Sequence, residues 1–319
     1  MDNMEKIQIC QEIVDQIQAE NRRPRCRLKL TRESFTVTDS HLGGVPYVPH
    51  DRQIPVDIDG NQLWLCAQIN FAQMPHMDGF PGSGLLQIFL EDWHFGDFGL
   101  EGEVFPPQDH WRIVYYQEID GTVTMEECEA KMAVPWAEAK RSNMPRPAGK
   151  FDLEDIEAGH DSVWRCPNVP LKVYFQKVEQ EGVNHEDFRF EQLFADALAA
   201  RVPSADPKEF QPYALACDTP KEREALDKIR RQIKNGGCKL GGYPNYLQDD
   251  PRLYDEEGEG WSDCDTLLLQ LYDDTYDYQQ DDIGVMDLDL NGGPLNFMIR
   301  NEDLKNCDFS RVLAQWACT

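Results

Sequence analysis

LGGVPYVP runs from Leu42 to Pro49 and LGGYPNYL runs from Leu240 to Leu247, so one unusual pattern occurs twice in this chain. Two adjacent glycines allow a positive φ and let another backbone approach closely, and the proline that follows prevents a helix. Each copy therefore predicts a tight loop that leads into extended chain.

The segments that follow the two loops also correspond. LWLCAQI (Leu63 to Ile69) is matched by TLLLQL (Thr266 to Leu271), and GLLQIFL (Gly84 to Leu90) is matched by GPLNFMI (Gly293 to Ile299). Every one of these runs is apolar and contains a single Gln or Asn. Because three anchors recur in the same order, we interpret the chain as a tandem duplication of one β-rich unit.

The expected architecture is α+β, with two similar β-rich repeats that have antiparallel sheets, packed together and flanked by helices. We expect the 319 residues to form one compact unit. Residues 1–40 are predicted to form an N-terminal helix and strand, 41–124 repeat 1, 125–235 a helical connector, and 236–319 repeat 2.

Three segments carry helix signals. Apolar residues recur at intervals of three and four from Met4 to Ile17, which is typical of an amphipathic helix. EDFRFEQLFADALAARVP predicts a helix that stops before Pro203. In TPKEREALDKIRRQIKNGG, Thr219 and Glu222 form a predicted capping box, and Gly236 is the predicted terminator.

The composition indicates a folded protein without a membrane span. Apolar residues make up 41% and charged residues 28% of the chain. No apolar run approaches the roughly 18 to 20 residues that a span requires, and the N-terminus does not resemble a signal peptide. Ten cysteines are spread singly, which favours reduced thiols over disulfides or a zinc site. We therefore expect a cytoplasmic protein with no cofactor and no bound metal.

Charge is the most distinctive feature of the composition. The chain has 31 basic and 58 acidic residues, a net charge of −27, which repels nucleic acids and anionic membranes unless a local basic patch intervenes. Residues 249–289 contain fifteen acidic residues and only one base, Arg252. Since complementary charge accelerates association, this segment predicts a surface for a basic protein. We assign that surface to Asp273, Asp274, Tyr276, Asp277, Tyr278, Asp281 and Asp282.

The same segment contains a partial calcium-binding motif. Asp287, Asp289 and Asn291 match the opening of an EF-hand loop, but Met298 stands where the loop needs a glutamate. We interpret this stretch instead as a strand, an Asn-Gly turn and a returning strand. A different type of divalent-cation site, built from Asp273, Asp274, Asp287 or Asp289, remains an alternative.

The sequence contains no recognisable catalytic motif, since GxSxG, HExxH, Walker and GxGxxG patterns are all missing. Four amides within apolar strands are the best candidates for a ligand site, because a buried amide without partners costs about 1 to 3 kcal/mol. Either they tie the loops of the two repeats together or they form the polar floor of a cleft between the repeats. These residues are Gln68, Gln87, Gln270 and Asn296.

The combination of these motifs resembles the YwqG-like proteins, a bacterial domain family of unknown function. The resemblance rests on the two LGG-P loops with LCAQIN, GLLQIFL, LLLQL and the closing DFSRVLAQW. It implies an α+β protein of two similar β-rich halves. Members often look like neighbours of polymorphic toxin systems, which implies an immunity role or another partner-binding role. The resemblance implies no catalytic residues.

Three functions are consistent with the sequence. The leading hypothesis is a non-enzymatic binding protein, in the form of an immunity protein that neutralises a basic partner through its acidic second repeat. The alternative is a small-molecule or metal-dependent enzyme with its site in the cleft between the repeats. A third hypothesis is a scaffold whose acidity serves only solubility.

Overall fold

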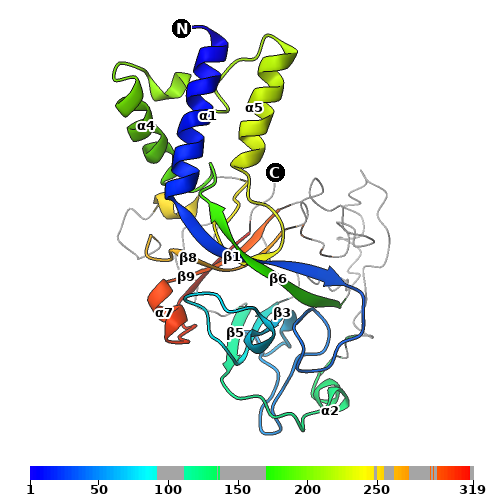
Figure 1. Cartoon of the computed structure of the whole chain (residues 1–319). Coiled ribbons are helices and arrows are strands. Elements are labelled where there is room, and N and C mark those ends of the chain that lie inside the picture. Colours follow the sequence, from blue (N-terminus) through cyan, green and yellow to red (C-terminus); the bar gives the residue numbers. More distant parts are fainter. Residues whose placement is uncertain are drawn as a thin grey trace, which may run out of the picture.

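The structure is a computed structural model, and it describes residues 1–91, 111–134, 136, 170–247, 250–254, 262–272, 288, 290 and 293–316. These residues form a mixed α+β fold, with one ten-stranded antiparallel sheet and five α-helices (Figure 1). Among the described helices, none combines the length and apolar character needed to cross a membrane.

The sheet is continuous from one end to the other, in the order β10-β9-β8-β7-β1-β6-β2-β3-β4-β5. Its long central pair is antiparallel, with Arg22 opposite Gly182 and Thr31 opposite Lys172. The strands are β1 (Arg22–Thr31), β2 (His41–Leu42), β3 (Trp64–Asn70), β4 (Leu85–Leu90), β5 (Trp111–Tyr116), β6 (Leu171–Gly182), β7 (Lys239–Gly241), β8 (Thr266–Leu271), β9 (Leu295–Ile299) and β10 (Val312–Trp316).

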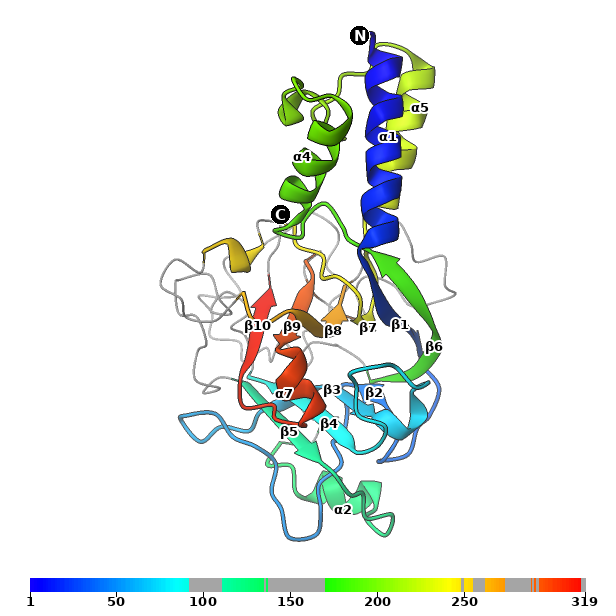
Figure 2. The same ribbon diagram turned by 60° about the vertical axis from the view of Figure 1, so that its left-hand side comes forward.

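The sheet curls, so that β7 to β10 lie across from β2 to β5 (Figure 2). A shared apolar core fills the space between them, and it contains Ile69 and Leu86 from one side together with Leu269 from the other. The rings of Trp111 in β5 and Phe297 in β9 lie 6.0 Å apart. Because both sides of the sheet bury their apolar faces in one core, each side would expose its apolar face to water without the other.

The two LGG-P loops have the backbone that their glycines predict. Gly43 and Gly44 have φ values of 62° and 80°, and Gly241 and Gly242 have φ values of 68° and 73°. The first loop follows β2 and the second begins in β7. The predicted left-handed backbone is therefore confirmed at both places.

Replacement of Gly241 by alanine is expected to destabilise the protein more than replacement of Gly60. Both glycines have positive φ, so each substitution costs about 1 to 2 kcal/mol of backbone strain. A Cβ at Gly241 would also collide with the carbonyl oxygen of Pro24, whereas a Cβ at Gly60 meets nothing within 4 Å. We expect Gly241→Ala to cost about 1 to 2 kcal/mol more in the free energy of unfolding in urea. Equal losses would contradict this expectation.

Three helices stand together at one end of the sheet (Figure 1). They are α1 (Asn3–Glu20), α4 (Phe190–Arg201) and α5 (Pro220–Gln232), and they share a separate core that includes Ile13, Phe194 and Leu226. Thr219 and Glu222 form the predicted capping box of α5. The other helices of the described residues are α2 (Met125–Ala130), α7 (Asn301–Lys305) and the short 3-10 turns η1 (Phe71–Gln73), η3 (Pro207–Glu209) and η4 (Pro251–Tyr254).

Three predictions about the fold need correction. The expected separate sheets are one sheet, because β1 and β6 pair with each other and with the strands on both sides. The predicted helical connector contains β6, whose side chains are mostly half-buried or exposed, so its sequence lacks the apolar run of a central strand. Helix α5 ends at Gln232, before Gly236, and the positive φ falls on Gly237.

Candidate functional site

In the first half, two of the predicted amides hold the first LGG-P loop. The Oε1 atom of Gln68 accepts hydrogen bonds from the backbone N–H of Tyr47 at 2.9 Å and from Nε2 of Gln87 at 2.7 Å. Its Nε2 atom donates to the carbonyls of Val37 and Asp39, both at 2.8 Å. Gln87 Nε2 also donates to the Tyr47 carbonyl at 2.8 Å. The two side-chain amides thus supply the hydrogen-bond partners that the backbone of a buried loop needs.

The other two amides bind the second LGG-P loop in the same way. Gln270 Oε1 accepts from the N–H of Asn245 at 2.7 Å, and its Nε2 donates to the carbonyl of Gly237 at 2.9 Å. Asn296 Nδ2 donates to the Asn245 carbonyl at 2.9 Å. All four amides are at most 1% exposed, so the structure places them in the interior, and their bonds hold loops of their own half.

A buried ion network lies beside the second loop. The side chain of Arg252 is 1% exposed, and its guanidinium contacts Asp250 Oδ2 at 2.6 Å and Asp187 Oδ2 at 3.2 Å. Arg189 also binds Asp187 through two nitrogens, at 2.7 and 2.8 Å. Burial alone would raise the pKa of Asp187, but hydrogen bonds and charge from Arg189 and Arg252 lower it below its usual value. Asp187 therefore stays ionised inside the protein.

A second buried ion pair joins the second loop to the sheet. Lys239 Nζ contacts Glu181 Oε2 at 2.8 Å and donates to the carbonyls of Asn235 at 3.0 Å and Tyr243 at 2.7 Å. Glu181 Oε2 also accepts from the N–H of Tyr243 at 2.8 Å. Burial lowers the pKa of Lys239 to about 8, although Glu181 opposes this shift. All three ammonium hydrogens thus have acceptors, and the lysine serves to position the loop.

The first loop carries a histidine before its Leu-Gly-Gly, where the second loop carries Lys239. His41 is fully buried, its Nδ1 atom lies 2.7 Å from the carbonyl oxygen of Gly43, and its ring stacks on Phe35 at 4.2 Å. Burial lowers the pKa of His41 to about 4, so the ring is neutral at physiological pH.

Glu186 connects the helical end of the molecule to the second loop. Its Oε2 atom accepts from the side chain of Asn245 at 2.7 Å and from the backbone N–H of Tyr246. Burial raises the pKa of Glu186 to about 7. A carboxyl with such a pKa changes protonation near neutral pH, which makes this contact sensitive to pH.

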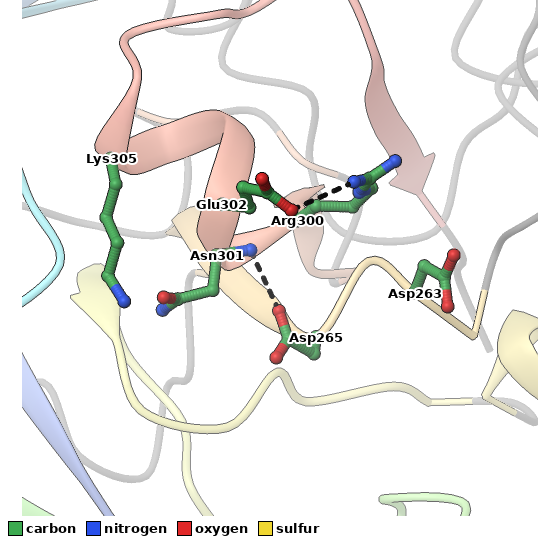
Figure 3. Close-up of a pocket in the computed structure, with 6 residues that line it drawn as sticks. All are labelled: Asp263, Asp265, Arg300, Asn301, Glu302 and Lys305. Carbon is green, nitrogen blue, oxygen red and sulfur yellow. Dashed lines mark hydrogen bonds and ion pairs between the residues drawn. The ribbon is translucent and has the colours of Figure 1, made fainter.

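An open hollow of about 460 Å³ lies where the described end of the acidic segment meets α7 (Figure 3). Asp265 Oδ1 accepts from the backbone N–H of Asn301 at 3.0 Å, and Arg300 contacts Glu302 at 3.5 Å. Figure 3 shows Asp263 and Lys305 on opposite sides of this hollow. With three carboxylates and two cations, its walls can exchange ion pairs with a charged partner. The lining residues are Asp263, Asp265, Arg300, Asn301, Glu302 and Lys305.

The seven residues predicted to bind a partner, from Asp273 to Asp282, lie outside the described residues, as do Asp287, Asp289 and Asn291. Among the residues that the structure describes, no three His, Cys, Asp or Glu side chains gather in a set that could hold a metal ion.

The buried ion network was missed by the sequence interpretation. One signal for it existed, since Arg252 is the single base in a strongly acidic segment. A lone cation among many carboxylates is a natural candidate for a buried, paired charge.

Comparison with known protein families gives a match over most of the chain. A family described as Domain of unknown function (DUF1963) matches residues 40–318, which include both LGG-P loops and every described strand except β1. No curated protein matches the sequence.

Proposed function

This chain belongs to the family described as Domain of unknown function (DUF1963), and we propose that it is a non-enzymatic binding protein for a basic protein partner. An immunity role in the cytoplasm, as the YwqG-like resemblance implies, is the specific form of this proposal. The acidic stretch (residues 253–289) is the proposed contact surface.

One observation supports the proposal above the others. Arg252, the single base in residues 249–289, is buried and paired with Asp187 and Asp250, so its charge is not available to offset the acids around it. From residue 253 to residue 289 the chain then has thirteen Asp and Glu and no Lys or Arg. A segment with charge of one sign attracts cationic partners and accelerates their association.

The described part of the acidic stretch supports the same proposal. Asp263 and Asp265 are exposed, whereas Cys264 between them is fully buried and anchors the segment. Glu302, with a side chain that is 77% exposed, lies at the same hollow (Figure 3). These carboxylates are accessible to the lysine and arginine side chains of a partner.

The internal duplication is part of the proposal as well. It is supported by the positive φ of the paired glycines in both loops and by the matching hydrogen bonds that Gln68 and Gln270 accept from the loop backbones. Under this proposal the two halves share one framework, and only the second half carries the acidic stretch.

The proposal is tested by affinity capture of partners from the protein's own cells with the tagged full chain. The variant Asp273→Asn, Asp274→Asn, Asp277→Asn, Asp281→Asn, Asp282→Asn loses five charges from the acidic stretch. The matched control loses five exposed charges from α1, α4 and α5, through Glu12→Gln, Glu20→Gln, Glu191→Gln, Asp196→Asn and Glu224→Gln. Both variants have the same net charge.

We expect one basic polypeptide to be captured in stoichiometric amount and to bind the first variant about tenfold or more weakly, with a lower association rate. The control variant should keep most of the affinity. Equal losses in both variants would show that only overall charge matters, and capture of no basic polypeptide at low salt would refute the proposal.

A further inference from the structure

A second hollow lies where the two sides of the curled sheet meet. It has a volume of about 510 Å³ and is formed by β5 together with the segment that joins α7 to β10. We call it the seam hollow, and its lining residues are Arg112, Ile113, Tyr115, Cys307, Phe309 and Ser310.

Arg112 is an unusual cation for so acidic a protein. Its side chain is half-buried, yet within the described part of the chain it makes no ion pair and no side-chain hydrogen bond. Asp308, in the facing segment, accepts instead from the backbone N–H of Ser310 at 3.0 Å. With 58 acidic residues in the chain, a guanidinium at a hollow that pairs with no carboxylate of the described residues points to an anion from outside.

Two aromatic side chains, Tyr115 and Phe309, lie beside Arg112 in the seam hollow, although polar atoms make up most of the surface that lines it. The rings of Tyr115 and Phe309 lie 5.2 Å apart, and Tyr115 packs against the shared core. The Tyr115 hydroxyl donates to the carbonyl of Ser83 at 2.9 Å, and burial raises the pKa of Tyr115, so the phenol stays neutral. A side chain at Gly84 would collide with Tyr115, so the glycine makes room for this ring.

We propose that the seam hollow binds a small aromatic monocarboxylate, whose carboxylate pairs with Arg112 and whose ring packs against Tyr115 and Phe309. One guanidinium balances one negative charge, so a ligand with several phosphates would keep unpaired charges near a protein of net charge −27. Salt screens the more distant carboxylates beyond about 8 Å at physiological ionic strength. The site is therefore selective for singly charged anions with an apolar body.

The test is calorimetric titration of the full chain with benzoate, with benzamide as the neutral ligand of nearly the same shape. Arg112→Gln removes the proposed partner of the carboxylate, and Arg112→Lys keeps a charge there. The matched control is Arg231→Gln, because Arg231 is exposed on α5 and also makes no ion pair within the described residues. Circular dichroism checks that each variant is folded.

We expect saturable benzoate binding that Arg112→Gln weakens about tenfold or more, with Arg231→Gln close to the unchanged protein. Arg112→Lys should retain more affinity than Arg112→Gln, and benzamide should bind about tenfold more weakly than benzoate. The proposal is overturned if benzoate does not bind, if benzamide binds as well as benzoate, or if Arg112→Gln leaves the affinity unchanged.

Discussion

Replacement of Arg252 by methionine is expected to lower the free energy of unfolding by about 3 to 5 kcal/mol. The substitution removes the guanidinium that contacts Asp187 and Asp250, and both carboxylates are fully buried. Asp250 would then be a buried charge without a cationic partner among the described residues, while Asp187 would keep only Arg189. Equilibrium unfolding in urea, followed by tryptophan fluorescence and circular dichroism, measures this loss.

Arg189→Met is the matched control for this prediction. Arg189 binds the same carboxylate, Asp187, but its side chain is 37% exposed, so water replaces part of the lost contact. We expect a loss of no more than about 1 kcal/mol. The double change Arg252→Met with Asp250→Asn should recover part of the stability, because it removes one uncompensated charge. Equal losses for Arg252→Met and Arg189→Met would contradict the assignment of a buried network.

The contribution of Glu186 to the stability of the protein is expected to fall between about pH 4.5 and 7, a window in which the lowered pKa of His41 acts in the opposite direction. Burial raises the pKa of Glu186 from 4.5 in a free side chain to about 7 in the folded state. In this window the unfolded chain releases a proton that the folded protein keeps, so the unfolded state gains stability as pH rises. Glu186 contributes about 3 kcal/mol to the free energy of unfolding below pH 4.5, relative to its ionised form. This contribution is lost as the pH rises to about 7.

Glu186→Gln should remove this fall, because a glutamine does not titrate and its Oε1 atom can still accept from Asn245 and Tyr246. Urea unfolding at pH 5, 6, 7 and 8 is compared for the two proteins, and the stability of Glu186→Gln relative to the unchanged protein should rise by about 3 kcal/mol across the series. Glu191→Gln, at an exposed position of α4, is the control. Its difference in free energy of unfolding from the unchanged protein should stay constant across the pH series. If the difference for Glu186→Gln is also constant, the proposed titration is wrong.

Local patterns predicted the elements of the fold that depend on short stretches of chain. The positive φ of Gly43 and Gly241, the capping box of Thr219 and the apolar strands β3, β4, β8 and β9 all follow from residues that are close in sequence. The strand β6 was missed for a related reason. It is central in the sheet, yet most of its side chains are not buried, so its composition resembles that of a surface segment.

The sequence by itself determined the two loops, the strands that follow them and the excess of acid, because backbone conformation and charge are properties of neighbouring residues. Only the tertiary structure decided which charges are buried. Arg252 meets Asp187 across 65 positions, and Lys239 meets Glu181 across 58. The seam hollow likewise needs Arg112 and Phe309, which come from opposite ends of the sheet order. Such pairings depend on how the sheet curls, and no short stretch of sequence encodes that curl.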